Sequence, residues 1–204
     1  MAFIFAHLHP DILQDVLTAD LFTKLVKKQF LPKGALLATE GEVNTRLSYI
    51  ETGLARVFYK TETETETETE TETETETTAW LVVDGHFAVV PGSFFDQEPS
   101  LHSIQLLEPS TVHSISYDDL QRLFDSSLVM NTVARRVLER YILQYEWRMQ
   151  LLRTRSAERR YDLFAEHFGK DMIRLPGKYV ASFLGITKHT LSRIRTRKAT
   201  KRYA

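Results

Sequence analysis

The chain has 204 residues, of which 43% are hydrophobic and 11% aromatic, enough to bury a core and too many for a wholly disordered protein. No run approaches the roughly 18 apolar residues of a transmembrane helix, and the absence of cysteine excludes disulfides, thiolate nucleophiles and iron–sulfur clusters. The formal net charge of −1 argues, taken alone, against a nucleic-acid-binding protein.

That net charge hides an uneven distribution along the chain. Residues 1–125 carry a net charge of −13 and residues 126–204 carry +12, while the last 35 residues alone carry +9. Such asymmetry indicates a basic module that meets a polyanion, joined to an acidic module with a different role. A solvated basic tail is the simpler alternative.

The acidic half begins with an expected helix around residues 10–21. The segment before it has no basic n-region and no small-residue cleavage site, so we expect no signal peptide and a cytoplasmic protein. Glycines in turn-like contexts then separate short segments rich in β-branched and aromatic residues, which predict strands at 54–59, 80–83, 87–90, 103–107 and 112–115. Many short strands with regular turns predict a sandwich, jelly roll or barrel.

Residues 61–77 consist of eight Thr-Glu units and a final threonine. On a strand every glutamate would lie on one face, where like charges repel each other, and no basic residue lies within the segment. We therefore expect a flexible acidic loop between two strands, which could reach roughly 55 Å when fully extended. A slipping DNA repeat would produce the same pattern.

Two helices are expected after the last strand. Ser116 is the expected N-cap of a short helix that ends at Phe124. A longer helix over residues 128–152 contains neither glycine nor proline. Apolar residues recur along it at spacings of three and four: Ala134, Leu138, Tyr141, Tyr145, Met149 and Leu152. Because further apolar residues flank this stripe, we predict a homodimer interface through residues 128–152, with packing inside one chain as the alternative.

An amphipathic helix is expected over residues 156–168, followed by two short helices joined by a turn. The first short helix has three apolar positions on one face: Val180, Ala181 and Leu184. Gly185 ends it because the tight turn requires a residue that tolerates positive φ. Thr187 then caps a second helix, whose apolar positions are Leu191 and Ile194. This arrangement is a helix-turn-helix motif.

The outward face of the second helix is rich in cations and hydrogen-bonding side chains, which suits the major groove of DNA. The residues expected to contact DNA are Thr187, Lys188, His189, Thr190, Ser192, Arg193 and Arg197. A structural αα-hairpin without a nucleic-acid partner is the alternative.

With these pieces in this order, the chain resembles the Crp/Fnr family of bacterial transcription regulators over nearly all of its length. Residues 30–37 and 40–42 look like the opening of a cyclic-nucleotide-binding-type β-roll, and residues 50–56 look like the strand–glycine–strand step that follows. Residues 181–194 are similar to the DNA-reading motif, the most specific match. This match places Arg193 on the DNA, with His189 where many members have glutamate.

The resemblance implies an α+β chain in three parts. These are a jelly-roll β-roll over residues 1–125, a long dimerisation helix over 126–153 and an all-α helix-turn-helix domain over 154–204. It implies a homodimeric, sequence-specific regulator without enzymatic activity that binds a palindromic operator in double-stranded DNA. An effector at the β-roll would shift the long helices and re-space the two recognition helices. RNA polymerase is the further partner that such a function implies.

The effector side departs from the family pattern. Cyclic-AMP-binding members carry a Gly-Glu pair followed by Arg-Ser/Thr-Ala, whereas here residues 92–95 read Gly-Ser-Phe-Phe and residues 100–102 read Ser-Leu-His. Both the ribose-binding carboxylate and the phosphate-binding guanidinium are missing, so cyclic nucleotide is a disfavoured ligand and no cofactor or metal is predicted. The degenerate pocket is expected to be lined by Gly92, Ser93, Phe94, Ser100, Leu101, His102 and Tyr145.

Two other hypotheses stay open at this point. The chain could be a β-roll ligand sensor or protein-interaction module with a vestigial helix-turn-helix. It could also be a jelly-roll metalloenzyme of the cupin type. For the metalloenzyme, the only His-x-His is His7-Leu8-His9, and no glutamate and third histidine follow at the spacing of a facial metal site.

Overall fold

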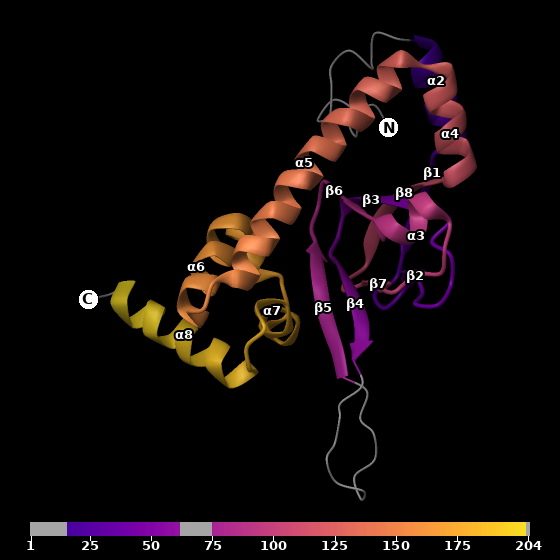
Figure 1. The fold of residues 1–204 in the computed structure, drawn as a ribbon. Coiled ribbons are helices and arrows are strands. Elements are labelled where there is room, and N and C mark those ends of the chain that lie inside the picture. The colour runs from indigo at the N-terminus through magenta and orange to yellow at the C-terminus, as the bar shows by residue number, and fades with distance from the viewer. Residues whose placement is uncertain (1–15, 62–74, 203–204) are drawn as a thin grey trace, which may run out of the picture.

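The computed structural model describes residues 16–61 and 75–202, which form a β-roll, a long helix and a group of shorter helices (Figure 1). The first described element is helix α2 (Val16–Leu25). Part of the helix expected at residues 10–21 lies outside the described residues, and α2 continues beyond its expected end into the turn before the first strand.

Two four-stranded antiparallel sheets make up the β-roll. The first has the order β1-β8-β3-β6 and consists of β1 (Lys27–Leu31), β8 (Ser110–Ser116), β3 (Arg46–Thr52) and β6 (His86–Ala88). The second has the order β2-β7-β4-β5 and consists of β2 (Leu36–Ala38), β7 (Ser103–Leu106), β4 (Ala55–Thr61) and β5 (Thr75–Val82). Neighbours far apart in the chain, such as β1 and β8, confirm the predicted jelly-roll type of fold.

The core of the roll follows from the alternation of side chains along each strand. Ile50 lies opposite Val112 across β3 and β8, and Val57 lies opposite Ile104 across β4 and β7. All four side chains are at most 8% exposed. The apolar segments that predicted strands therefore supply the faces that close the roll.

The two ends of the Thr-Glu repeat belong to the sheet, which corrects the loop expected over residues 61–77. Thr61 pairs with Thr75, and Tyr59 pairs with Thr77; residues 62–74 lie outside the described residues. Glu76 forms an ion pair with Arg56 of β4 at 2.6 Å. The neighbouring strand thus supplies the cation that the repeat itself lacks.

Helix α3 (Pro91–Asp96) lies within the roll between β6 and β7, while α4 (Tyr117–Ser126) and α5 (Leu128–Arg153) connect the roll to the C-terminal part of the chain. The backbone N–H of Asp119 donates to Ser116 Oγ at 3.2 Å, which confirms the predicted N-cap of α4. Ser127 caps α5 by accepting from the N–H of Met130. The first turns of α5 are buried against α2 and α4 through Met130 and Val133.

The C-terminal domain consists of α6 (Ala157–Phe168), the 3₁₀ helix η2 (Gly169–Ile173), α7 (Gly177–Leu184) and α8 (Lys188–Arg202). Leu151 of α5, Phe164 of α6 and Phe183 of α7 are fully buried in one apolar cluster. That cluster includes Leu54 and Leu81 of the roll, and Figure 1 shows α7 beside β5. The helical domain therefore packs directly on the roll.

In residues 16–61 and 75–202, no helix is long and apolar enough to cross a membrane. Nor does that part of the chain gather three or more histidine and carboxylate side chains in a position to hold a metal ion. His7 and His9, on which the cupin hypothesis depended, lie outside the described residues.

Candidate functional site

The turn between α7 and α8 requires glycine at position 185. Gly185 has φ 61°, in the left-handed region, and its N–H donates to the carbonyl of Ser182. The next residue, Ile186, donates to the carbonyl of Ala181. A Cβ on Gly185 would also lie 3.2 Å from Nη1 of Arg160. The backbone conformation therefore favours glycine at position 185, and the nearby guanidinium leaves little room for a side chain there.

The start of α8 is capped by Thr187. The backbone N–H of Thr190 donates to Thr187 Oγ1 at 3.1 Å, and the two threonine hydroxyls lie 2.9 Å apart. Leu191 and Ile194 on the inner face of α8 are buried, at 3% and 2% exposure. Their burial turns the opposite face of α8 to solvent.

The residues predicted to contact DNA fall into three groups. Lys188, His189, Ser192 and Arg193 are all exposed on α8. Thr187 and Thr190 lie at the start of the helix, and their hydroxyls are hydrogen-bonded to each other. Arg197 lies further along, where it forms an ion pair with Glu158 of α6 at 3.2 Å.

Only part of the positive charge on α8 is neutralised within the described chain. Arg197 and Lys198 pair with carboxylates of α6; Lys198 reaches Asp162 at 2.5 Å, and that hydrogen bond raises the pKa of the lysine. Among the described residues, neither Lys188 nor Arg193 has a carboxylate within ion-pair distance. The back of α8 is thus held to α6 by ion pairs, while its outer face keeps unpaired cations.

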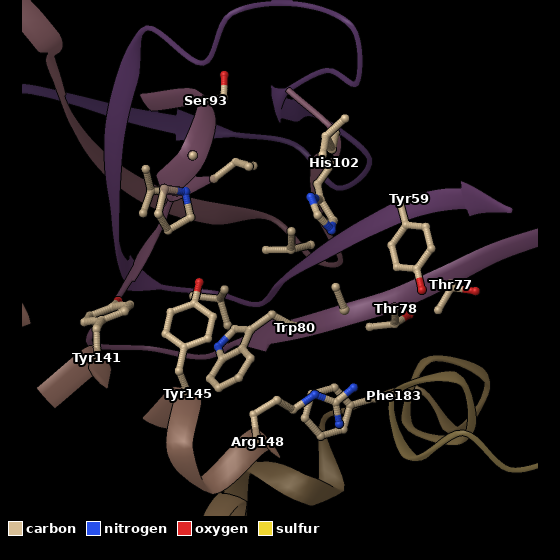
Figure 2. Close-up of a pocket in the computed structure, with 18 of the residues that line it drawn as sticks. Tyr59, Thr77, Thr78, Trp80, Ser93, His102, Tyr141, Tyr145, Arg148 and Phe183 are labelled. Carbon is tan, nitrogen blue, oxygen red and sulfur yellow. The ribbon is translucent and has the colours of Figure 1, made fainter. Parts of the chain in front are cut away.

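A cavity of about 920 Å³ lies where the roll, α5 and α7 meet (Figure 2). Five of the seven residues predicted for an effector pocket line it: Gly92, Ser93, Leu101, His102 and Tyr145. The other two do not. Phe94 is fully buried on the opposite side of α3, with its ring 5.6 Å from that of Tyr117. The hydroxyl of Ser100 donates to the carbonyl of His102.

At the α3 end of the cavity, the polar groups are already bonded within the protein. Ser93 Oγ accepts from the N–H of Asn44 at 2.8 Å and donates to the carbonyl of Glu98 at 2.6 Å. The charged residues at this end, Asp96 and Glu98, are acidic and exposed. Burial lowers the pKa of His102, so its ring is neutral at pH 7 and does not offset these charges. This end is therefore poorly suited to a phosphate.

The opposite end of the cavity is aromatic and carries one buried cation. Figure 2 shows Arg148 of α5 against Phe183, away from Ser93, and its guanidinium carbon lies 3.6 Å from the ring centroid of Phe183. The ring of Trp80 lies 5.6 Å from that of Tyr145 and 6.2 Å from that of Phe183. Arg148 and Trp80 were not among the predicted pocket residues. The available signal was that Arg148 follows Tyr145 by three residues, which places both on one helix face.

The same region joins the roll to the helix-turn-helix. The N–H of Thr78 in β5 donates to Ser182 Oγ in α7 at 2.8 Å. The guanidinium of Arg56 lies 4.3 Å from the ring centroid of Tyr179, also in α7. Strands β4 and β5 of the roll therefore both contact helix α7, and Thr78, Ser182 and Phe183 at this junction also line the cavity.

Five exposed apolar residues form a stripe along α5, here called the α5 seam: Leu138, Ile142, Tyr145, Met149 and Leu152. They recur at alternating spacings of four and three, the pattern of a two-stranded coiled coil. Tyr141, expected in the same stripe, instead faces the roll, where its hydroxyl donates to the carbonyl of Phe87 at 2.9 Å. Burial raises the pKa of Tyr141, which keeps this hydroxyl protonated.

No protein-family model and no curated protein matches the sequence. Several solved structures are nevertheless similar. FixK2 from Bradyrhizobium japonicum has a TM-score of 0.70 at 13% identity, covering 86% of this chain and 85% of its own. The c-di-GMP-responsive global regulator CLP from Xanthomonas campestris has a TM-score of 0.66 at 16% identity, covering 92% and 93%. A regulator assigned to the crp/fnr family, from Eubacterium rectale, has a TM-score of 0.65 at 13% identity, covering 96% and 88%. At these identities the likeness shows a shared fold, and it confirms the predicted α+β class.

Proposed function

We propose that this chain, which has the fold of the Crp/Fnr transcription regulators over most of its length, is itself a sequence-specific DNA-binding regulator. The observation that carries the proposal is the outer face of α8. That face exposes four side chains: Lys188, His189, Ser192 and Arg193. Gly185 forms the turn before the helix, and Thr187 caps its first turn. Exposed cations beside hydrogen-bonding side chains match the base edges and phosphates of a major groove. We assign no catalytic activity to the chain and place it in the cytoplasm of a bacterium.

The distribution of charge supports a DNA partner. Lys188 and Arg193 are free of carboxylate partners among the described residues, whereas the cations on the back of α8 are paired. Neutralising phosphates with free cations releases counterions from DNA, which gives affinity and a dependence on salt. The contacts to DNA are therefore assigned to the first turns of α8, with Thr187 and Thr190 at their edge and Arg197 behind them.

We further propose a homodimer formed along α5. The α5 seam leaves large apolar side chains exposed, with Ile142 at 66% and Met149 at 55%. A second copy of the same helix covers such a seam in a parallel pair and relates the two copies by a two-fold axis. The dimer would present its two α8 helices to successive major grooves about 34 Å apart, so the operator is a palindrome.

The three-part organisation follows from this assignment. Residues 1–125 sense an effector, residues 126–153 dimerise and residues 154–204 bind DNA, with RNA polymerase as the expected protein partner. The cavity lies where all three parts meet, and Tyr145 belongs both to its wall and to the α5 seam. A ligand in the cavity would therefore act on the dimer and on α7 together.

Selection of bound sequences from random DNA tests the proposal. We expect a palindromic motif with half-sites about ten base pairs apart and an affinity that falls steeply with salt. A flat titration that does not respond to salt would contradict the proposal and favour a β-roll sensor or interaction module with a vestigial helix-turn-helix. Sedimentation of the free protein gives the oligomeric state independently of DNA.

A further inference from the structure

We propose that the aromatic end of the cavity binds a small anionic ligand with a flat apolar body, and that Arg148 and Thr78 hold its anionic group. The inference deepens the proposed function by naming the ligand class of its sensing site, and it rests on that function only for its effect on DNA binding. The ligand group is an oxyanion, a carboxylate or a phosphate.

Arg148 supplies the first argument. Its side chain is 9% exposed, and Nη1 has no hydrogen-bond partner. In the described part of the chain no carboxylate lies within ion-pair distance of this guanidinium, whose stacking partner is the neutral ring of Phe183. A buried cation without an anion is costly, since neither water nor a counter-charge stabilises it. An oxyanion in the cavity would satisfy both the charge and the free N–H.

Thr78 supplies a second, independent polar group on the same cavity wall. The residue is 1% exposed, and its Oγ1 also lacks a hydrogen-bond partner. Its backbone N–H donates to Ser182 Oγ at 2.8 Å, which holds this part of β5 against α7. Both residues line the cavity, Thr78 from β5 and Arg148 from α5, and Figure 2 shows both away from Ser93. Two unsatisfied buried groups from two elements point to a common missing partner.

The charges around Arg148 favour an anion rather than a neutral acceptor. Arg160 lies near enough for its charge to act on Arg148, and Nε of Arg160 is itself buried without a partner. Burial lowers the pKa of Arg148 to about 10; Tyr59 partly opposes this and Arg160 adds to it. At pH 7 the guanidinium is still charged, and among the described residues neither Arg148 nor Arg160 has a carboxylate within ion-pair distance. A bound oxyanion would relieve that repulsion.

The volume of the cavity and its other lining residues indicate the size and shape of the ligand. The cavity of about 920 Å³ lies at the upper end of the range for small-molecule sites, roughly 300–1,000 Å³. Trp80, Tyr145 and Phe183 present aromatic rings at the Arg148 end. Asp96 and Glu98 lie at the α3 end, so an anionic ligand enters with its charged group turned away from them. This orientation puts the anion opposite the position that the family resemblance gives to a cyclic phosphate.

The consequence for DNA binding follows from the neighbours of the two residues. Arg148 stacks on Phe183, and Thr78 is bonded to Ser182, the preceding residue of α7. An anion that draws Arg148 towards Thr78 acts on both contacts at once. The ligand therefore sets the position of α7, and through the Gly185 turn the position of α8.

A matched pair of fluorescent probes tests the site. Anilinonaphthalene sulfonate has an aromatic body with an anionic group, and N-phenylnaphthylamine has the same body without the charge. We expect Arg148→Gln to weaken binding of the sulfonate by about tenfold or more, because a charge-assisted bond is lost, and to leave the neutral probe unchanged. Thr78→Val, which keeps the backbone bond to Ser182, should weaken the sulfonate several-fold.

The control variant is Arg140→Gln, which removes an exposed arginine from the same helix outside the cavity. Far-UV circular dichroism and thermal melting establish that all variants are folded. Equal sulfonate affinities of wild type, Arg148→Gln and Thr78→Val would overturn the inference, as would a failure of the wild type to bind the sulfonate. Equal loss of both probes in Arg148→Gln would also overturn it, since that result reports a collapsed cavity.

Competition distinguishes the two oxyanions. Naphthoate and naphthyl phosphate should displace the sulfonate from the wild type, whereas neutral naphthalenemethanol should not. The more effective anion identifies the ligand group, and equal displacement by the neutral compound would contradict an anion site. DNA selection with the unliganded protein is a separate readout, so loss of the palindrome would reject the proposed function without affecting the probe result.

Discussion

The guanidinium of Arg174 donates to the carboxylate of Asp84 at 2.5 Å, which ties the segment before α7 to the turn between β5 and β6. The same guanidinium also contacts Glu108 of the roll. Asp84 is fixed in turn, because its Oδ1 accepts from the N–H of Gly53 at 2.5 Å. We call the contacts of Arg174 with Asp84 and Glu108 the interdomain latch. They join the segment before α7 to two turns of the roll.

Replacing Arg174 with Gln should loosen the helical domain from the roll without unfolding either part. Backbone amides of residues 169–176 should exchange hydrogen faster, because the latch holds their segment in place. The melting temperature should change little, since partly exposed ion pairs contribute only about 0–1 kcal/mol. Hydrogen–deuterium exchange with mass spectrometry measures the effect, with Arg155→Gln as the control. Unchanged exchange in residues 169–176 would show that the latch does not set the interface.

The latch should also respond to acid. Burial raises the pKa of Asp84, but hydrogen bonds from Arg174 and Gly53 lower it by more, so the net pKa lies below the ordinary value. A lowered pKa stabilises the latched state above the unperturbed pKa of about 3.9, and that stabilisation is lost as the pH falls through the lower value. Exchange in residues 169–176 should therefore rise below about pH 4. The rise should be smaller in Arg174→Gln, where the ion pair of the carboxylate is gone and the bond from the N–H of Gly53 is left.

A charge in the α5 seam should separate the proposed dimer. Ile142→Glu places a carboxylate at the most exposed position of the seam, where in the dimer it would be buried against its own copy without a counter-charge. Sedimentation should show a monomer at concentrations where the wild type is dimeric. Arg140→Glu adds a carboxylate two residues away on the outer face and should leave the dimer intact. A dimer that persists in Ile142→Glu would place the interface elsewhere.

Gly53 is a position where the fold has no room for a side chain. Its φ is 133°, and a Cβ would lie 2.0 Å from Ser110 Oγ and 3.0 Å from the Cα of Ser110. Gly53→Ala should therefore destabilise the protein by about 3 kcal/mol, from strain and from displacement of β8. Gly92→Ala is the matched control, because no atom lies within 4 Å of its added Cβ and its φ is not positive. Chemical denaturation of both variants should show a loss only for Gly53→Ala.

The helix-turn-helix could be predicted from sequence because its signals are local. The φ of Gly185, the cap from Thr187 and the burial of Leu191 all depend on residues within a few positions of one another. Strands β4 to β8 were predictable for the same reason, whereas β1, β2 and β3 were not among the segments that predicted strands. The ends of the Thr-Glu repeat were not predictable, because the cation that pairs with Glu76 comes from Arg56 on a neighbouring strand.

The aromatic end of the cavity is formed by residues that are far apart in the sequence. Arg148 belongs to a helix with several exposed arginines, and nothing in its neighbours in sequence separates it from them. It stacks on Phe183 of α7, and the packing of β5 on α7 brings Thr78 to the same cavity. Phe94, predicted for the pocket from its place in the sequence, faces the other way because the core beneath α4 takes up its ring. Five of the seven predicted pocket residues line the cavity, whereas the buried cation in its wall, Arg148, was not predicted.

Arg193 and Arg197 should differ in what they contribute to DNA binding. Arg193 is exposed on the outer face of α8 without an ion-pair partner among the described residues, so Arg193→Ala should cost about 1–3 kcal/mol on the selected operator and reduce discrimination at one base pair per half-site. Arg197 is paired with Glu158, so Arg197→Ala should weaken binding to every DNA sequence by about the same amount, and by less than Arg193→Ala weakens binding to the operator. Fluorescence anisotropy on the operator and its single-base variants measures both.

The ranking of the operator variants by affinity separates the two roles further. Arg193→Ala should change the ranking of the operator variants, whereas Arg197→Ala should leave that ranking intact and lower only the common affinity. His189 stands where many members of the family that the chain resembles have glutamate. His189→Ala should therefore alter base preference at a base pair next to the one that Arg193 contacts. If Arg193→Ala binds the operator as tightly as the wild type with an unchanged ranking, α8 does not read bases through this residue, and the assignment of its outer face must be revised.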